Sequence, residues 1–164
     1  MQGDIALCEA QNSARSFYHL IELGVPFPHD RFGSFVGYKT DHDPRQRGTS
    51  AGPLTSRWMF DRLASRVKSL GIPIYDRHEA IALLTSGNGE GKQVVGAAVL
   101  DLTKLKDGGH GLVVFNAVNV ILGTGGPAGM YRTSVYPESQ IGSHGLAFAA
   151  GAAGHNLTES QFGL

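Results

Sequence analysis

Hydrophobic side chains in the first 71 residues recur with the period of an α-helix in two places. The first pattern predicts a helix over 4–23, because Gly24 is a typical helix cap and Pro26 prevents the helix from continuing. The second pattern predicts an amphipathic helix over 53–70, with proline in its first turn and Gly71 at its end. The sequence therefore begins with two helices separated by a long connection.

The connection over 27–51 is polar and glycine-containing, and we predict a solvated loop there. Asp41, His42 and Asp43 are residue types that bind metals, but no second set of ligands follows at a suitable spacing. We therefore predict no metal site in this chain.

After Gly71 the pattern changes from the helical period to short apolar runs bounded by turn residues. Glycine-rich segments at 86–91 and 106–111 are typical of hairpin turns. We predict an α/β fold whose mixed sheet contains an inserted antiparallel meander. The predicted strands are 72–75, 80–85, 94–102, 112–117 and 118–122.

The last predicted strand runs directly into a glycine turn at 123–126. Because glycine has no Cβ atom, the backbone of such a turn can approach a ligand closely, and open α/β sheets bind cofactors at the ends of their strands. We predict that Thr124, Gly125 and Gly126 lie at the end of a central strand, with their amides facing an open cleft. The alternative is a tight turn that needs glycine only for its backbone conformation.

Residues 143–153 are rich in alanine and glycine, which predicts a small helix packed closely against a sheet or a cofactor. Backbone amides at its start, including that of Gly145, are candidates for contact with a negatively charged group. His144 at this position is interpreted as a surface or capping residue.

Composition narrows the range of partners. Lys plus Arg and Asp plus Glu number 14 each, so no net charge recruits nucleic acid or an anionic membrane. The sequence has no apolar run long enough to span a membrane and no signal-peptide pattern. The single cysteine, Cys8, fits a reducing compartment, so we expect a small-molecule ligand, no membrane insertion and a cytoplasmic location.

The glycine turn and the residues after it resemble a run in the flavoprotein family of fumarate reductase and succinate dehydrogenase. L-Aspartate oxidases and ketosteroid dehydrogenases are similar to that family. The matching segments are ILGTGG at 121–126, YRTS at 131–134, IGSHGLA at 141–147 and AGA at 150–152. LTESQF at 157–162 also resembles the family phrase MEFVQF. Several motifs in the right order are more specific than one glycine motif.

The resemblance implies FAD as the cofactor and a partial flavoprotein fold of the two-dinucleotide-binding type. It places the glycine turn against the dinucleotide, and Glu79 and Ala80 under the adenine with backbone contacts. It describes 1–164 as a single partial FAD-binding domain. Within that domain, a helix and loop over 1–52 border the cofactor site, and 53–164 supply a helix, the meander and the return strand.

Two departures from the family pattern bear on chemistry. His144 replaces an acidic residue, which removes any contact made through that carboxylate. The stretch 48–53 lacks a histidine that touches substrate in the family, which argues against succinate or fumarate as the substrate. The family's acid and base residues follow the phrase that 157–162 resembles, so the catalytic residues are expected beyond Leu164 and none is assigned here.

The GxGxxG turn that holds the pyrophosphate of a dinucleotide is absent before Gly24. We therefore interpret the chain as an internal fragment of an FAD-dependent oxidoreductase that transfers hydride between a small-molecule substrate and flavin. An electron-transfer partner is possible, and the fragment alone is not expected to retain FAD. The alternative is a non-catalytic α/β binding or interaction module derived from the same fold.

Overall fold

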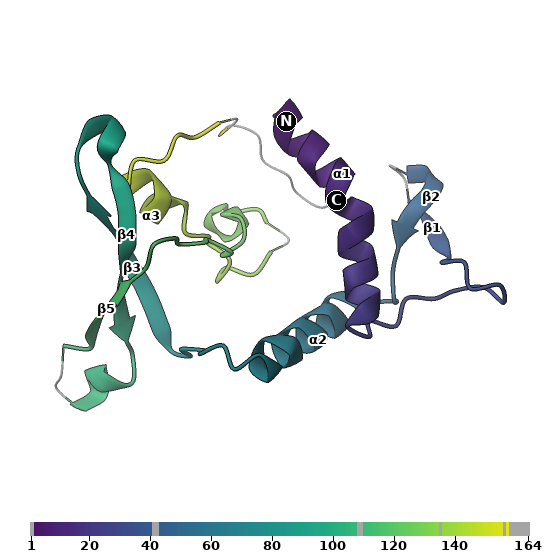
Figure 1. The fold of residues 1–164 in the computed structure, drawn as a ribbon, viewed down its shortest axis with the longest axis horizontal. Helices are drawn as coiled ribbons and strands as arrows, with labels where there is room; N and C mark the ends of the chain where they lie inside the picture. Colours follow the sequence, from purple (N-terminus) through teal and green to yellow (C-terminus); the bar gives the residue numbers. More distant parts are fainter. Residues whose placement is uncertain (1, 41–42, 108–109, 135, 156, 158–164) are drawn as a thin grey trace. The chain divides into compact units, whose positions relative to one another are not determined.

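The computed structural model describes residues 2–40, 43–107, 110–134, 136–155 and 157. They contain helices and antiparallel strands, which form two compact units, Met1–Ile74 and Tyr75–Leu164. Figure 1 shows the order of the elements along the chain. The predicted similarity of 157–162 to a family phrase falls almost wholly outside the described residues.

In the first unit, helix α1 (Gly3–Glu22) ends where the sequence predicts, since the Gly24 N–H bonds back to the carbonyl of Ile21. The aromatic ring of Phe17 packs against Phe27 at 4.9 Å and against Phe35 at 5.0 Å between ring centres. Phe27 and the nearby Val25 are buried. The chain after α1 therefore folds back on the helix.

Helix α2 (Thr55–Ser69) confirms the second predicted helix. The Thr55 hydroxyl accepts a hydrogen bond from the Ala51 N–H at 2.9 Å and donates one to the Gly52 carbonyl at 2.6 Å. Arg62 donates from Nε to the Gly24 carbonyl at 3.1 Å. This side chain therefore joins α2 to the end of α1.

The predicted loop over 27–51 is wrong in one part, because it contains an antiparallel pair, β1 (Gly37–Thr40) and β2 (Asp43–Thr49). The Asp43 carboxylate accepts hydrogen bonds from the N–H groups of Arg47 and Gly48 at 2.7 and 3.1 Å. A Cβ atom at Gly37 would lie 1.8 Å from the Gln46 carbonyl oxygen. Local hydrogen bonds stabilise this hairpin, and Gly37 allows its two strands to approach closely. Its sequence therefore lacks the alternation of apolar and polar residues that would predict a strand.

The second unit is built on a three-stranded antiparallel sheet in the order β3–β4–β5 (Figure 1). This sheet confirms the predicted meander, with closely similar bounds. The strands are β3 (His78–Ser86), β4 (Gln93–Asp101) and β5 (Leu112–Asn116). Short 3₁₀ turns follow β3 and β4, at Gly89–Gly91 and Lys104–Asp107. Val99 and Gly96 on the central strand β4 are buried.

Two predicted strands, 72–75 and 118–122, are wrong, because neither segment belongs to a strand. A strand needs a hydrogen-bonded neighbour, and no described segment pairs with either one. Val118 and Ile121 are consequently 91% and 93% exposed. Both described sheets are antiparallel, so the mixed sheet is not seen among these residues.

The last helix, α3 (His144–Ala149), is shorter than the predicted helix over 143–153. Gly151 follows the helix cap Ala150; its φ of +102° suits glycine, and its N–H donates to the Phe148 carbonyl at 2.9 Å. α3 packs against β3 (Figure 1). This contact ties the residues after the glycine turn to the sheet.

Candidate functional site

The glycine turn at 123–126 lies in an irregular segment that follows β5, not at the end of a central strand as predicted. Gly125 adopts a φ of +74°, a conformation that favours glycine. Gly123 and Gly126 have no such φ, and a Cβ atom built on either would meet no atom within 4 Å. The described residues therefore give no steric or conformational reason for glycine at these two positions.

The segment after the turn folds back on itself at Gly129. The Gly129 N–H donates to the Gln140 carbonyl at 2.8 Å. A Cβ atom at Gly129 would lie 2.7–2.8 Å from the carbonyl oxygens of Pro137, Glu138 and Gln140. Gly129 is thus required by close backbone packing within the chain, unlike Gly123 and Gly126.

The glycine turn also approaches the start of α3. Gly142 has a φ of +67°, and a Cβ atom there would lie 3.2 Å from the Gly125 carbonyl oxygen. Gly145, in the first turn of α3, again has open space where a Cβ would be. Because α3 has only six residues, we assign no anion site to its N-terminus. Gly145 remains a candidate cofactor contact only because open space lies where its Cβ would be.

The remaining predicted site residues, Glu79 and Ala80, lie near the start of β3 and are exposed. They pair with Leu100 and Val99 of β4. The register then shifts between Ala80 and Ala82, which leaves Ile81 as an extra residue in a β-bulge. The structure therefore brings the glycine turn next to α3 and packs α3 on β3, the strand that carries Glu79 and Ala80.

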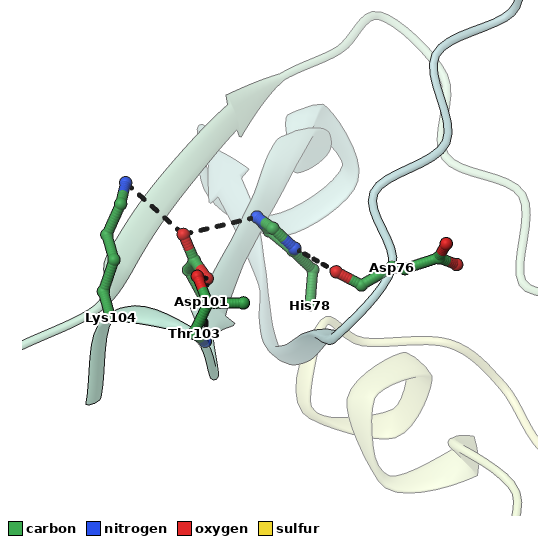
Figure 2. A network of polar contacts seen from close by, with 5 residues as sticks. All are labelled: Asp76, His78, Asp101, Thr103 and Lys104. Carbon is green, nitrogen blue, oxygen red and sulfur yellow. Dashed lines mark hydrogen bonds and ion pairs between the residues drawn. The ribbon is translucent and has the colours of Figure 1, made fainter. Parts of the chain in front are cut away.

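Sequence reasoning missed a polar cluster at the first residue of β3 (Figure 2). Asp101, the last residue of β4, is only 5% exposed and accepts hydrogen bonds from the Thr103 N–H at 3.0 Å and the Thr103 hydroxyl at 2.5 Å. Its other carboxylate oxygen lies 3.4 Å from Lys104 Nζ and 3.8 Å from His78 Nε2. An aspartate two residues before a threonine at a strand end is a turn signal that could have indicated this cluster.

The neighbours of Asp101 change its acidity. The Thr103 hydroxyl is the largest influence, and with the Thr103 N–H, Lys104 and His78 it lowers the pKa of Asp101 from 3.8 to about 2, although burial opposes this. These groups favour the charged carboxylate, so Asp101 stays ionised in the folded protein above that pH.

This shift predicts a dependence of stability on pH. Because the folded-state pKa is lowered, Asp101 stabilises the fold above pH 3.8, and this contribution is lost as the pH falls towards 2. Asp101→Asn should reduce the fall in unfolding free energy over that interval, as measured by urea unfolding of wild type and variant. Asp61→Asn, which removes an exposed carboxylate, is the control. Equal slopes for wild type and Asp101→Asn would contradict the assignment.

A shallow groove of about 490 Å³ lies in the first unit. None of its lining side chains is charged, and it includes part of the stretch 48–53 in which the family histidine is missing. The lining residues are Pro28, Val36, Gly37, Tyr38, Ser50, Gly52 and Pro53.

Residues 3–164 match a protein family described as an FAD binding domain. The chain belongs to this FAD-binding family. It is 31% identical over 145 residues to L-aspartate oxidase 2 of Ralstonia nicotianae, a match that covers 87% of this chain and 25% of that protein. The chain thus spans about a quarter of the length of this curated relative.

A solved structure has the same fold as this chain. It is a mutant of E. coli quinol fumarate reductase FrdA, which superposes with a TM-score of 0.61 at 23% identity. The superposition covers 76% of this chain and 20% of FrdA. The comparisons support the predicted resemblance to the fumarate reductase and succinate dehydrogenase flavoproteins.

The glycines of this segment differ in the space around them. Gly123, Gly126 and Gly145 leave space for a group from outside the chain to reach the backbone, whereas Gly129 and Gly142 are explained by internal packing. Among the described residues, no three His, Cys, Asp or Glu side chains gather in a group that could hold a metal ion. Within the same residues, no helix is both long and apolar enough to cross a bilayer.

Proposed function

We propose that this chain is the cofactor-facing part of an FAD-dependent oxidoreductase of the fumarate reductase and succinate dehydrogenase type. The observation that carries the proposal is the open space at Gly123 and Gly126, where no contact with another described residue accounts for glycine. The family match over 3–164 supplies the identity of the group that would use this face.

In this proposal the backbone of Thr124, Gly125 and Gly126 lies against the dinucleotide, Gly145 lines the same surface, and Glu79 and Ala80 contact the adenine through their backbone. The protein groups bind and orient the cofactor and keep side chains away from it. FAD, when bound, supplies hydride transfer to or from a carbon–carbon bond of the substrate. We assign no catalytic residue within this chain.

We further propose a two-dinucleotide-binding flavoprotein fold for the larger protein, with 1–164 as a partial FAD-binding domain. A small-molecule substrate and an electron-transfer partner belong to the same proposal, and a cytoplasmic location is consistent with the single, free Cys8. The missing histidine in the stretch 48–53 supports a substrate other than succinate or fumarate. A non-catalytic module is not favoured, since the match to the FAD-binding family spans nearly the whole chain.

The proposal predicts that Gly126→Ala weakens FAD binding without lowering the stability of the fold. We expect the variant to unfold at the same urea concentration as wild type, because the new methyl group meets open space. In the polypeptide encoded by the complete genomic reading frame that contains this chain, we expect FAD affinity to fall by about tenfold or more, from loss of a close backbone contact to a charged group. Fluorescence titration of the apoprotein with FAD measures this.

Gly91→Ala is the matched control, since a Cβ atom at Gly91 also meets open space but the residue lies in the turn between β3 and β4. We expect Gly91→Ala to bind FAD as wild type does. If Gly126→Ala also binds FAD with unchanged affinity, the cofactor does not lie against this turn.

A further inference from the structure

We infer that Asp101 and His78 are positioning residues for the cofactor contact at Glu79 and Ala80. This inference rests on the proposed function and adds residues that the family resemblance does not assign. Asp101 pairs with His78 across β3 and β4, and His78 directly precedes Glu79. The cluster therefore lies at the end of the strand that carries the proposed adenine contact.

The side chain of His78 is held from both sides of its ring. Its Nδ1 atom lies 2.8 Å from the carbonyl oxygen of Asp76, and its Nε2 atom lies 3.8 Å from the Asp101 carboxylate. The ring of Tyr75 packs against it edge-on at 5.5 Å. Figure 2 shows the imidazole of His78 between Asp76 and Asp101.

The backbone at this end of the sheet is also fixed. Arg77 has a φ of +58°, which is uncommon for a residue other than glycine and needs support from its surroundings. That support includes a hydrogen bond from the Leu102 N–H to the Arg77 carbonyl at 3.0 Å. On the other side, the Asp101 N–H donates to the Gly111 carbonyl at 2.7 Å. Backbone hydrogen bonds therefore support the residue before His78 in its unusual conformation, next to the cluster.

Beyond Glu79 and Ala80, the β-bulge at Ile81 interrupts the regular ladder. The two residues are thus a short segment between the anchored end of β3 and an irregularity. A bulge changes the twist and direction of a strand, so the hydrogen bonds beyond the bulge do little to fix the backbone before it. The orientation of Glu79 and Ala80 consequently depends on their pairing with Leu100 and Val99 and on the anchor formed by His78 and Asp101.

The test uses the apoprotein of the polypeptide encoded by the complete reading frame that contains this chain, with adenosine monophosphate (AMP), the adenine-containing portion of FAD, as the probe. Amide hydrogen exchange and AMP titration are both followed by NMR at residues 78–80. We expect Asp101→Asn and His78→Ala each to raise exchange rates at these amides about tenfold, through easier local opening. We expect the dissociation constant for AMP to rise about tenfold as well, as for loss of one ordered polar contact.

Two further variants separate positioning from general damage. Thr103→Ser keeps the hydroxyl that donates to Asp101, so it should retain wild-type exchange and AMP binding. Asp61→Asn makes the same chemical change on α2 and should alter neither. All titrations are made in conditions where urea unfolding shows each variant to be fully folded.

The outcomes distinguish the two levels of the proposal. Faster exchange together with weaker AMP binding in Asp101→Asn supports the positioning role. Unchanged exchange and AMP binding in both Asp101→Asn and His78→Ala overturns it, while leaving the proposed cofactor contact in place. If AMP shifts none of the wild-type amides at 78–80, the adenine contact at β3 is overturned, and with it the positioning role.

Discussion

The 164-residue chain, expressed and purified alone, will leave a gel-filtration column without bound FAD. In dinucleotide-binding folds much of the pyrophosphate affinity comes from the first glycine loop and the helix that follows it. No GxGxxG sequence lies between Met1 and Gly24. Each charge-assisted hydrogen bond that is missing removes about 1.5–3 kcal/mol, so the loss of several weakens binding by several powers of ten.

The visible absorption band of flavin in the protein peak is the measurement. Protein loaded with excess FAD before the column should emerge colourless, and the flavin should elute later as a small molecule. A yellow protein peak with near-stoichiometric FAD would contradict this prediction. It would mean that another segment of this chain supplies the phosphate-binding groups.

Gly96→Ala will strongly destabilise the three-stranded sheet. Gly96 is buried on the central strand β4, and a Cβ atom there would lie 2.0 Å from the Phe115 carbonyl oxygen of β5. The obstacle is backbone and cannot rotate away, so β4 and β5 must separate locally. We expect the free energy of unfolding to fall by about 3 kcal/mol, at the upper end of the effects of overpacking.

Urea unfolding followed by circular dichroism measures this change. Gly91→Ala is again the matched control, because it adds the same methyl group in the turn before β4, where it meets no atom within 4 Å. The control should change the unfolding free energy by no more than about 0.5 kcal/mol. A loss of similar size in both variants would show that contact with β5 is not what requires glycine at position 96.

The elements that sequence patterns predicted well are those stabilised by their own local features. α1 and α2 follow from the helical period and from glycine or proline at their ends. The three strands of the meander follow from apolar runs between glycine-rich turns, which bring neighbouring segments together with little loop between them. In each case the information needed lies within the element or its adjoining turn.

The elements that were predicted wrongly depend on something outside themselves. The apolar run 118–122 has the composition of a buried strand, but composition supplies no hydrogen-bonded neighbour, and Val118 and Ile121 lie exposed. The hairpin β1–β2 shows the converse. Its second strand is polar, and the hydrogen bonds from Arg47 and Gly48 to the Asp43 carboxylate, which no periodicity reveals, hold it in place.

Only the local features of the candidate site could be predicted from the sequence. The cluster of glycines at 123–126 is visible in the sequence, but only the structure separates Gly126, which faces open space, from Gly129, which packs against three carbonyls. Asp101 was missed although Thr103 and Lys104 follow it closely in the sequence; only its contact with His78 arises through the register of β3 and β4. The roles of Glu79 and Ala80 came from family resemblance and stay a prediction.

The central claim is that the backbone at 123–126 and at Gly145 faces bound FAD. Its most direct test is amide hydrogen exchange in the polypeptide encoded by the complete reading frame, compared with and without saturating FAD. We predict that FAD slows exchange at Thr124, Gly125, Gly126 and Gly145 by about tenfold or more, while amides in α2 change little. Stoichiometric FAD binding with unchanged exchange at all four residues would contradict the claim.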